Sequence, residues 1–139
     1  MKINGLELPS ALDKAIESGA WKMPKDPELV QRVFPLERLV QPVLYDKYSL
    51  AFENADWPNE TKSSYVGAKG GRELPGDIDT SKSAIIGDLG PDLPIALDYR
   101  HSAERPSVVY LFQDGPWTVR WATAAPDIES LIFALRLGR

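Results

Sequence analysis

The sequence predicts an α+β fold, with a mainly antiparallel β-sheet on which N-terminal helices and a C-terminal amphipathic helix pack. Residues 10–34 show the caps and apolar faces of two short helices, and residues 126–138 repeat apolar side chains at helical spacing. Between them, residues 84–121 hold short apolar runs separated by Gly, Pro and Asp turns. These turns are too short for crossover helices, so neighbouring strands are expected to pair antiparallel. At 139 residues, the chain is expected to form a single domain, residues 1–139.

The N-terminal region is expected to form two structural helices. Ser10 is predicted to cap the first helix by accepting a hydrogen bond from a free amide, and Gly19 suits the left-handed residue after its last turn. Asp26 and Pro27 are predicted to be the cap and the first residue of the second helix, which Pro35 ends. Apolar side chains on one face of each helix indicate that both pack on the core.

One further strand is expected between these helices and the apolar runs. Tyr48, Leu50 and Phe52 alternate with Ser, Ala and Glu, and this alternation predicts a strand. The short run at residues 43–45 either extends that strand or closes a short helix. Residues 54–62 are predicted to form a loop.

The second half of the chain is expected to supply the main strands. A Gly-Asp pair should end the short buried strand at 84–86, and residues 95–99 should have one apolar and one more polar face. Residues 108–112 are apolar throughout and are expected to be covered on both sides. Residues 117–121 alternate again, and the Asp-Gly pair at 114–115 predicts a hairpin between these last two strands.

The closing helix is predicted to begin at Pro126 and Asp127 and to end at Gly138. Its apolar residues follow the i, i+3, i+4, i+7 spacing of one buried stripe. They are Ile128, Leu131, Ile132 and Leu135.

Composition argues against an enzyme, a cofactor or a metal site. The chain has no cysteine. Its one histidine, His101, lies in a polar stretch and is expected to be a solvated loop residue. The spacing of acids over 77–88 partly matches a calcium loop, but Lys82 occupies the position that requires Gly. The N-terminus lacks the apolar core of a signal peptide, and no apolar run approaches the roughly 20 residues of a membrane span. A cytoplasmic protein without a membrane partner is therefore expected.

The net charge of −4 is unevenly distributed. Residues 73–98 contain six acidic residues and one basic residue, Lys82, which gives this segment a charge of −5 and leaves the rest of the chain near neutral. The six acids are Glu73, Asp77, Asp79, Asp88, Asp92 and Asp98. Such a field repels nucleic acid and attracts a basic protein partner. The competing interpretation is that Asp is simply common in turns.

Four residues are candidates for contacting a partner. Glu73, Asp79 and Asp92 lie in or beside predicted turns and are expected to face solvent. Reversal of these three charges to Lys is expected to leave the melting temperature nearly unchanged while slowing association. Trp57 lies in the expected loop, where an exposed indole would suit an interface hot spot.

Several short motifs occur in a fixed order in the second half of the chain. They are Gly-Asp-Ile-Asp at 76–79, Ile-Gly-Asp at 86–88, Leu-Asp-Tyr-Arg at 97–100 and Pro-Ser-Val-Val-Tyr at 106–110, followed by the closing helix. This ordered set resembles the SUKH superfamily of cell-wall-assembly-regulator-like proteins. Many bacterial members are thought to be immunity proteins, so the resemblance implies a non-enzymatic domain that neutralises a cognate toxin, possibly a nuclease, by direct binding.

Two other classes stay open. The resemblance also allows a regulatory or scaffolding module with no toxin partner, which a neighbouring toxin reading frame would argue against. A small hydrolase would require a pocket of convergent polar groups around His101. The sequence indicates no oligomeric state.

Overall fold

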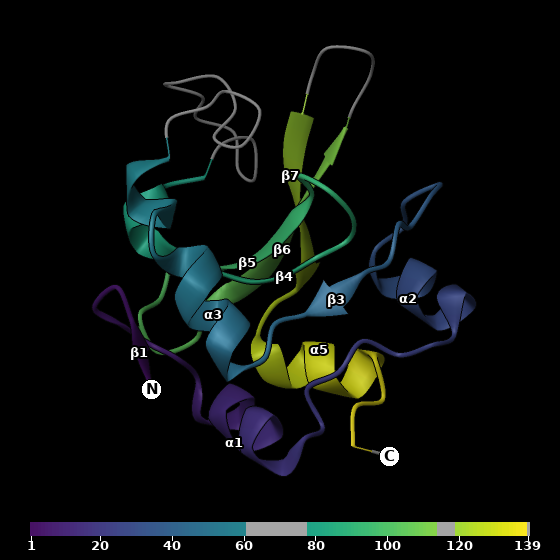
Figure 1. Ribbon diagram of the computed structural model, residues 1–139, viewed down its shortest axis with the longest axis horizontal. Helices are drawn as coiled ribbons and strands as arrows, with labels where there is room; N and C mark the ends of the chain where they lie inside the picture. The colour runs from purple at the N-terminus through teal and green to yellow at the C-terminus, as the bar shows by residue number, and fades with distance from the viewer. Residues whose placement is uncertain (61–77, 114–118, 139) are drawn as a thin grey trace.

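The computed structural model describes residues 1–60, 78–113 and 119–138 and shows an α+β fold (Figure 1). Its main sheet has the strand order β3-β4-β5-β6-β7, with every neighbouring pair antiparallel, and β1 and β2 form a second, small antiparallel sheet. The strands are β1 (Lys2–Ile3), β2 (Leu6–Glu7), β3 (Val43–Leu44), β4 (Ser83–Asp88), β5 (Pro94–Asp98), β6 (Ser107–Gln113) and β7 (Val119–Ala125). The helices are α1 (Ser10–Ser18), α2 (Pro27–Val33), α3 (Lys47–Asn54) and α5 (Ile128–Ala134), with 3-10 turns η1 (Trp57–Asn59) and η2 (Thr80–Lys82).

The two N-terminal helices are confirmed, and one of their predicted caps is wrong. Asp26 caps α2 by accepting a hydrogen bond from the Glu28 amide, and Pro27 is the first residue of that helix. Gly19 follows α1 with φ of 80°, the left-handed conformation that favours glycine. Ser10, however, is already inside α1, so it does not cap that helix by a side-chain hydrogen bond.

The strand predicted around Tyr48 and Phe52 is wrong, because this segment forms α3. The Asp46 carboxylate caps the helix by accepting from the Ser49 amide at 2.8 Å. Leu50 faces the core and is fully buried, whereas Tyr48 and Phe52 are 83% and 79% exposed. The alternation that indicated a strand therefore came from aromatic residues that face solvent on a helix.

Strand β4 continues past its predicted end. Gly87 pairs with Leu44 and Asp88 pairs with Val43, and the register shifts between Ile85 and Gly87. A Cβ atom at residue 87 would lie 2.5 Å from the Val43 carbonyl oxygen, so only glycine allows β3 to approach β4 this closely.

Strand β5 is buried on both faces, so the polar face predicted for it is wrong. The Phe34 ring lies 5.4 Å from that of Tyr110, and the Trp57 ring lies 6.4 Å from that of Trp121. Trp121 pairs with Leu111, the neighbour of Tyr110 in β6, so these two contacts lie on opposite faces of the sheet. The segments around α2 and η1 thus cover both sides.

The closing helix is confirmed, although it ends earlier than predicted. Asp127 caps α5 by accepting from the Ser130 amide at 2.8 Å, and it pairs with Arg105 at 2.7 Å. Leu131 is fully buried. The helix ends at Ala134, and a further turn leads to Gly138 with φ of 77°.

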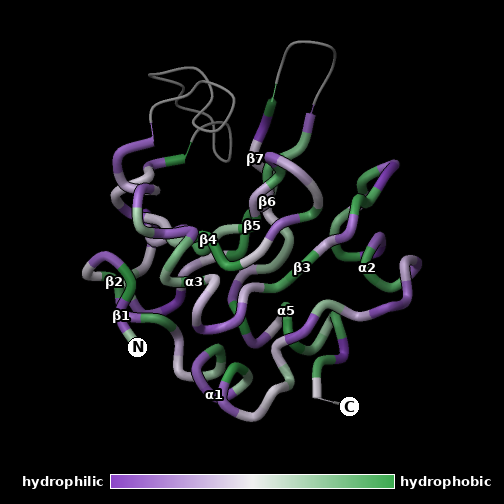
Figure 2. Tube along the Cα trace, viewed as in Figure 1, coloured by the Kyte–Doolittle hydropathy of each residue, from purple (hydrophilic) through white to green (hydrophobic). Residues whose placement is uncertain are grey.

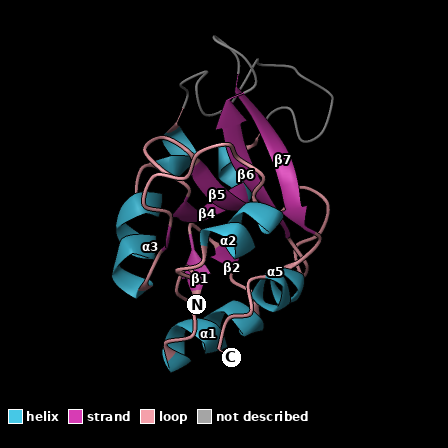
Figure 3. Cartoon of the chain, turned by 90° about the vertical axis from the view of Figure 1, so that its right-hand side faces the viewer, coloured by secondary structure: helices cyan, strands magenta, loops and turns pink. Residues whose placement is uncertain are grey.

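The hydrophobic core lies around the main sheet. Figure 2 shows hydrophobic residues along β4, β5 and β6. Helices α1 and α5 contact each other at one end of the molecule, and α3 packs along β4 (Figures 1 and 3). This packing places the end of α3 beside the middle of β4, where the Asn54 side chain bonds Ile85.

Candidate functional site

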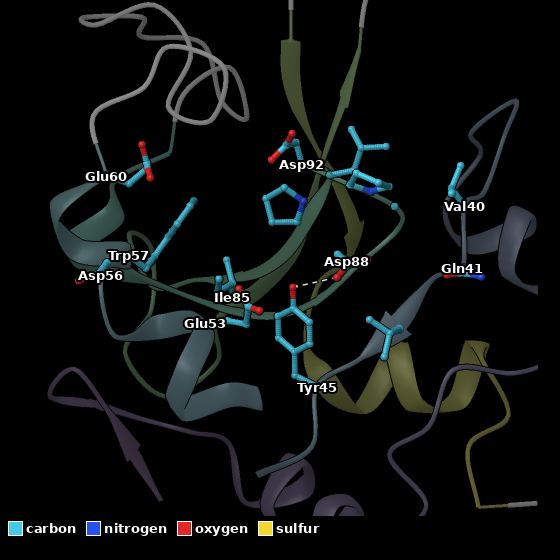
Figure 4. Close-up of a pocket in the computed structure, with 15 residues that line it drawn as sticks. Val40, Gln41, Tyr45, Glu53, Asp56, Trp57, Glu60, Ile85, Asp88 and Asp92 are labelled. Atoms are coloured by element: carbon cyan, nitrogen blue, oxygen red, sulfur yellow. Dashed lines mark hydrogen bonds between the residues drawn. The ribbon is translucent and has the colours of Figure 1, made fainter. Parts of the chain in front are cut away.

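A pocket of about 470 Å³ lies between the α3–η1 segment and the β4–β5 turn (Figure 4). Three stretches of chain meet there, within residues 40–45, 53–60 and 85–94. The lining residues are Val40, Gln41, Val43, Tyr45, Glu53, Asp56, Trp57, Glu60, Ile85, Asp88, Gly90, Pro91, Asp92, Leu93 and Pro94. The pocket therefore depends on the packing of α3 and η1 against the sheet.

The pocket is strongly acidic. Among the lining residues that the structure describes, five carry carboxylates and none is Lys or Arg. The five are Glu53, Asp56, Glu60, Asp88 and Asp92. Figure 4 shows Glu60 and Asp92 on opposite sides of the pocket. Walls of low dielectric concentrate the field of like charges, so this arrangement favours a positively charged group.

Asp88 lines the pocket and accepts a hydrogen bond from a neighbouring side chain. The Tyr45 hydroxyl donates to its Oδ2 atom at 3.0 Å (Figure 4). Partial burial raises the pKa of the Asp88 carboxyl, and hydrogen bonds from Tyr45 and from the Gly90 backbone only partly oppose this rise. A cation in the pocket would favour the charged form and lower this pKa again.

Asp92 faces solvent, as predicted, but its backbone is special. Its φ of 60° lies in the left-handed region, in a turn closed by the Leu93 amide donating to the Gly90 carbonyl at 3.2 Å. Asp and Asn tolerate this conformation better than most residues. Lys at residue 92 would add backbone strain, so Asn is the better replacement.

Trp57 does not lie in an exposed loop. It begins η1, is 5% exposed, and donates its indole N–H to the Ser83 hydroxyl at 2.9 Å. The prediction of an exposed indole is therefore wrong, because the 3-10 turn packs the ring against Trp121. Trp57 instead contributes a wall of the pocket.

A third predicted contact residue, Asp79, is not among the residues that line the pocket. Asp79 is half-buried and caps η2, accepting from the Ser81 amide at 2.9 Å and from its hydroxyl at 2.6 Å. These bonds, the hydroxyl first, lower the pKa of Asp79. Replacement by Lys would remove the cap, so the structure leads us to expect a lower melting temperature for this variant. Glu73 lies outside the described residues, as does Asp77.

The remaining acid of the predicted segment has a structural partner. Asp98 is buried, and its carboxylate accepts from the Arg100 guanidinium at 2.8 Å and from the Arg100 backbone amide at 3.1 Å. Its charge is compensated where it lies. Asp79 therefore serves as a cap and Asp98 as the partner of Arg100, whereas Asp88 and Asp92 line the pocket.

The sequence analysis missed the acids of residues 53–60. Glu53, Asp56 and Glu60 are spaced by three and four residues, which places them on one side of a helical segment. That signal was hidden because residues 54–62 were predicted to form a loop. Recognition of the Asp46 cap would have revealed the helix and this acidic side.

Asn54 was also missed, and it fixes α3 against the sheet. Its buried side-chain amide donates to the Ile85 carbonyl at 2.8 Å and to the Leu50 carbonyl at 2.9 Å. Its Oδ1 atom accepts from the Ile85 amide at 2.9 Å. Because Asn54 lies between Glu53 and the pocket residues that follow, these bonds hold the acidic segment in place.

His101 is exposed in the loop after β5 and does not line this pocket. In residues 1–60, 78–113 and 119–138, no three His, Asp or Glu side chains are grouped so that they could hold a metal ion. No helix in the same part of the chain has the length and apolar character needed to cross a membrane.

Comparisons of this chain with protein-family models, with curated proteins and with solved structures find no match.

Proposed function

We propose that this chain is a non-enzymatic protein-binding domain that holds a basic partner at its acidic pocket. The observation that supports this proposal is the set of five carboxylates around one pocket, among whose described lining residues there is no Lys or Arg. The resemblance to the SUKH superfamily gives the biological setting, in which the domain is an immunity protein and the partner a bacterial toxin domain.

A nuclease-type toxin suits this pocket best. Enzymes that cleave nucleic acid need basic clefts to hold a polyanionic substrate, and an acidic surface complements such a cleft. Opposite charges also speed the encounter between the two proteins. The domain would act by occupying the cleft, so that neutralisation requires no reaction on either protein.

Neutralisation of the pocket carboxylates tests this proposal. The variant Glu53→Gln/Glu60→Gln/Asp92→Asn removes three charges from the lining, and Asn preserves the left-handed tolerance at residue 92. Binding kinetics are measured against Lys- and Arg-rich peptides selected on the wild-type protein from a phage-displayed library. We expect slower association and a weaker dependence of the association rate on salt, with little change in the melting temperature.

A matched control removes the same number of charges elsewhere. Glu17, Glu37 and Glu129 are exposed and do not line the pocket. Their replacement by Gln is expected to alter association much less, because these charges lie away from the interface. Equal effects of the two triple variants would show that only net charge matters and would contradict a pocket-centred interface.

A further inference from the structure

The outward face of α3 carries an apolar stripe. Tyr48 and Phe52 are the two most exposed large hydrophobic residues among those described, at 83% and 79%. Ala51 and Ala55 are exposed as well. These four residues follow the spacing i, i+3, i+4, i+7, which is the spacing of a helix face that packs against another surface. Leu50 already supplies the contact of α3 with the core, so this second face is available to a partner.

The stripe adjoins the acidic pocket. Glu53 directly follows Phe52, and Asp56 directly follows Ala55; both acids are exposed and both line the pocket. Helix α3 lies on the outside of the molecule, and its C-terminal end leads into the pocket (Figures 1 and 4). The two features therefore form one continuous surface, apolar on the helix and acidic beyond it.

We propose that the α3 stripe, formed by Tyr48, Ala51, Phe52 and Ala55, anchors the same basic partner protein. Apolar side chains of the partner would cover the two aromatic rings, and Lys or Arg residues beside them would face the carboxylates. This inference rests on the proposed function and adds the hot spot of the interface to it. Aromatic residues with an acidic border suit that role, because burial supplies affinity and charge supplies orientation.

A second copy of the chain is a poorer occupant. A twofold contact places the same patch on both molecules, so the acids beside the stripe would add negative charge on both sides of the interface. An eight-residue helix is also only about 12 Å long, which is small for the roughly 1,200 Å² or more that a stable interface buries. A larger partner that also fills the pocket meets both requirements.

The test uses a phage-displayed library of random peptides, selected on the wild-type protein. Selected peptides are expected to combine a large apolar residue with several Lys or Arg residues. Their affinity is then measured for the variant Tyr48→Ala/Phe52→Ala, in which both substitutions are compatible with a helix. We expect the affinity to fall about tenfold or more, while the salt dependence of binding is retained. Phe133→Ala is the matched control, because Phe133 is 67% exposed on another helix, α5; it should bind like the wild type.

A charge variant separates the two proposals. Glu53→Gln/Asp56→Asn should reduce mainly the salt dependence of binding. If the charge variant loses salt dependence while Tyr48→Ala/Phe52→Ala binds like the wild type, the acidic pocket is supported as the binding site and the proposed role of the stripe is contradicted. Selected peptides that lack Lys and Arg and bind without salt dependence would contradict the proposed function itself. A wild-type dimer in solution that Tyr48→Ala/Phe52→Ala dissociates would assign the stripe to a second copy and overturn the proposal.

Discussion

The Asn54 side chain forms with the Ile85 backbone the hydrogen bonds that a neighbouring strand forms elsewhere in the sheet. Strand β3 pairs with β4 only at Gly87 and Asp88, and the Tyr45 amide donates to the Ile86 carbonyl before the chain turns into α3. The Asn54 side chain then satisfies both backbone groups of Ile85. One buried amide thus joins the helix to the sheet.

Asn54→Ala should therefore destabilise the protein by about 2 kcal/mol or more, because the Ile85 amide and carbonyl would lose their partners while buried. Urea unfolding measures this loss. Asn59→Ala provides the control, since Asn59 is exposed and its replacement should change stability by about 0.5 kcal/mol or less. Equal losses in the two variants would mean that water replaces the Asn54 amide.

Asp88 links the pocket to pH. Its pKa is raised in the folded protein, so the charged carboxylate lowers stability at neutral pH, and this penalty disappears as acid protonates the group. Asp88→Asn should raise the melting temperature at neutral pH. The difference from wild type should shrink as the pH falls through the raised pKa of Asp88 toward the ordinary value for aspartate. A difference that grows in acid would show that Asp88 stabilises the fold as a charged group.

At the scale of elements, the sequence predicted the helices and strands whose apolar residues face the core. The alternation or continuous apolar character of β4 to β7 and the stripe of α5 are signals of local periodicity, and the structure confirms these elements. The prediction for residues 47–54 was wrong because Tyr48 and Phe52 face solvent, so the spacing of these aromatic residues does not mark a face buried in the core. Such failures are expected at functional sites.

The same reasoning explains how much of the site was predicted. Asp88 and Asp92 belong to an acidic run that is visible in the sequence. Glu53, Asp56 and Glu60 reach the pocket only because Asn54 and Trp57 hold α3 and η1 against β4. This contact joins residues far apart in the chain, and no local pattern encodes it.

Helix α5 gives a direct test of the packing. Leu131 is fully buried, so Leu131→Ala should destabilise the protein by roughly 2–5 kcal/mol through lost transfer energy and a residual cavity. Thermal or denaturant unfolding measures the change. Leu131→Met, which nearly conserves volume, should cost less than about 1.5 kcal/mol. An unchanged melting temperature for Leu131→Ala would remove α5 from the core.

At the scale of the whole molecule, the fold gathers charge that the sequence distributes. The chain carries a net charge of only −4, yet five carboxylates from the α3–η1 segment and from the end of β4 and the turn after it converge on one pocket. Asp98 and Asp127, by contrast, are each paired with an arginine. The fold therefore brings five acids together beside the exposed aromatic face of α3.

Amide hydrogen exchange of the complex with a Lys- and Arg-rich peptide selected on this protein tests the central claim most directly. The account predicts that binding slows exchange in residues 47–60 and 85–94, which form the stripe and the pocket, and leaves residues 10–34 little changed. Slower exchange confined to residues 10–34 and 128–138, with the pocket segments unaffected at saturating partner, would contradict it.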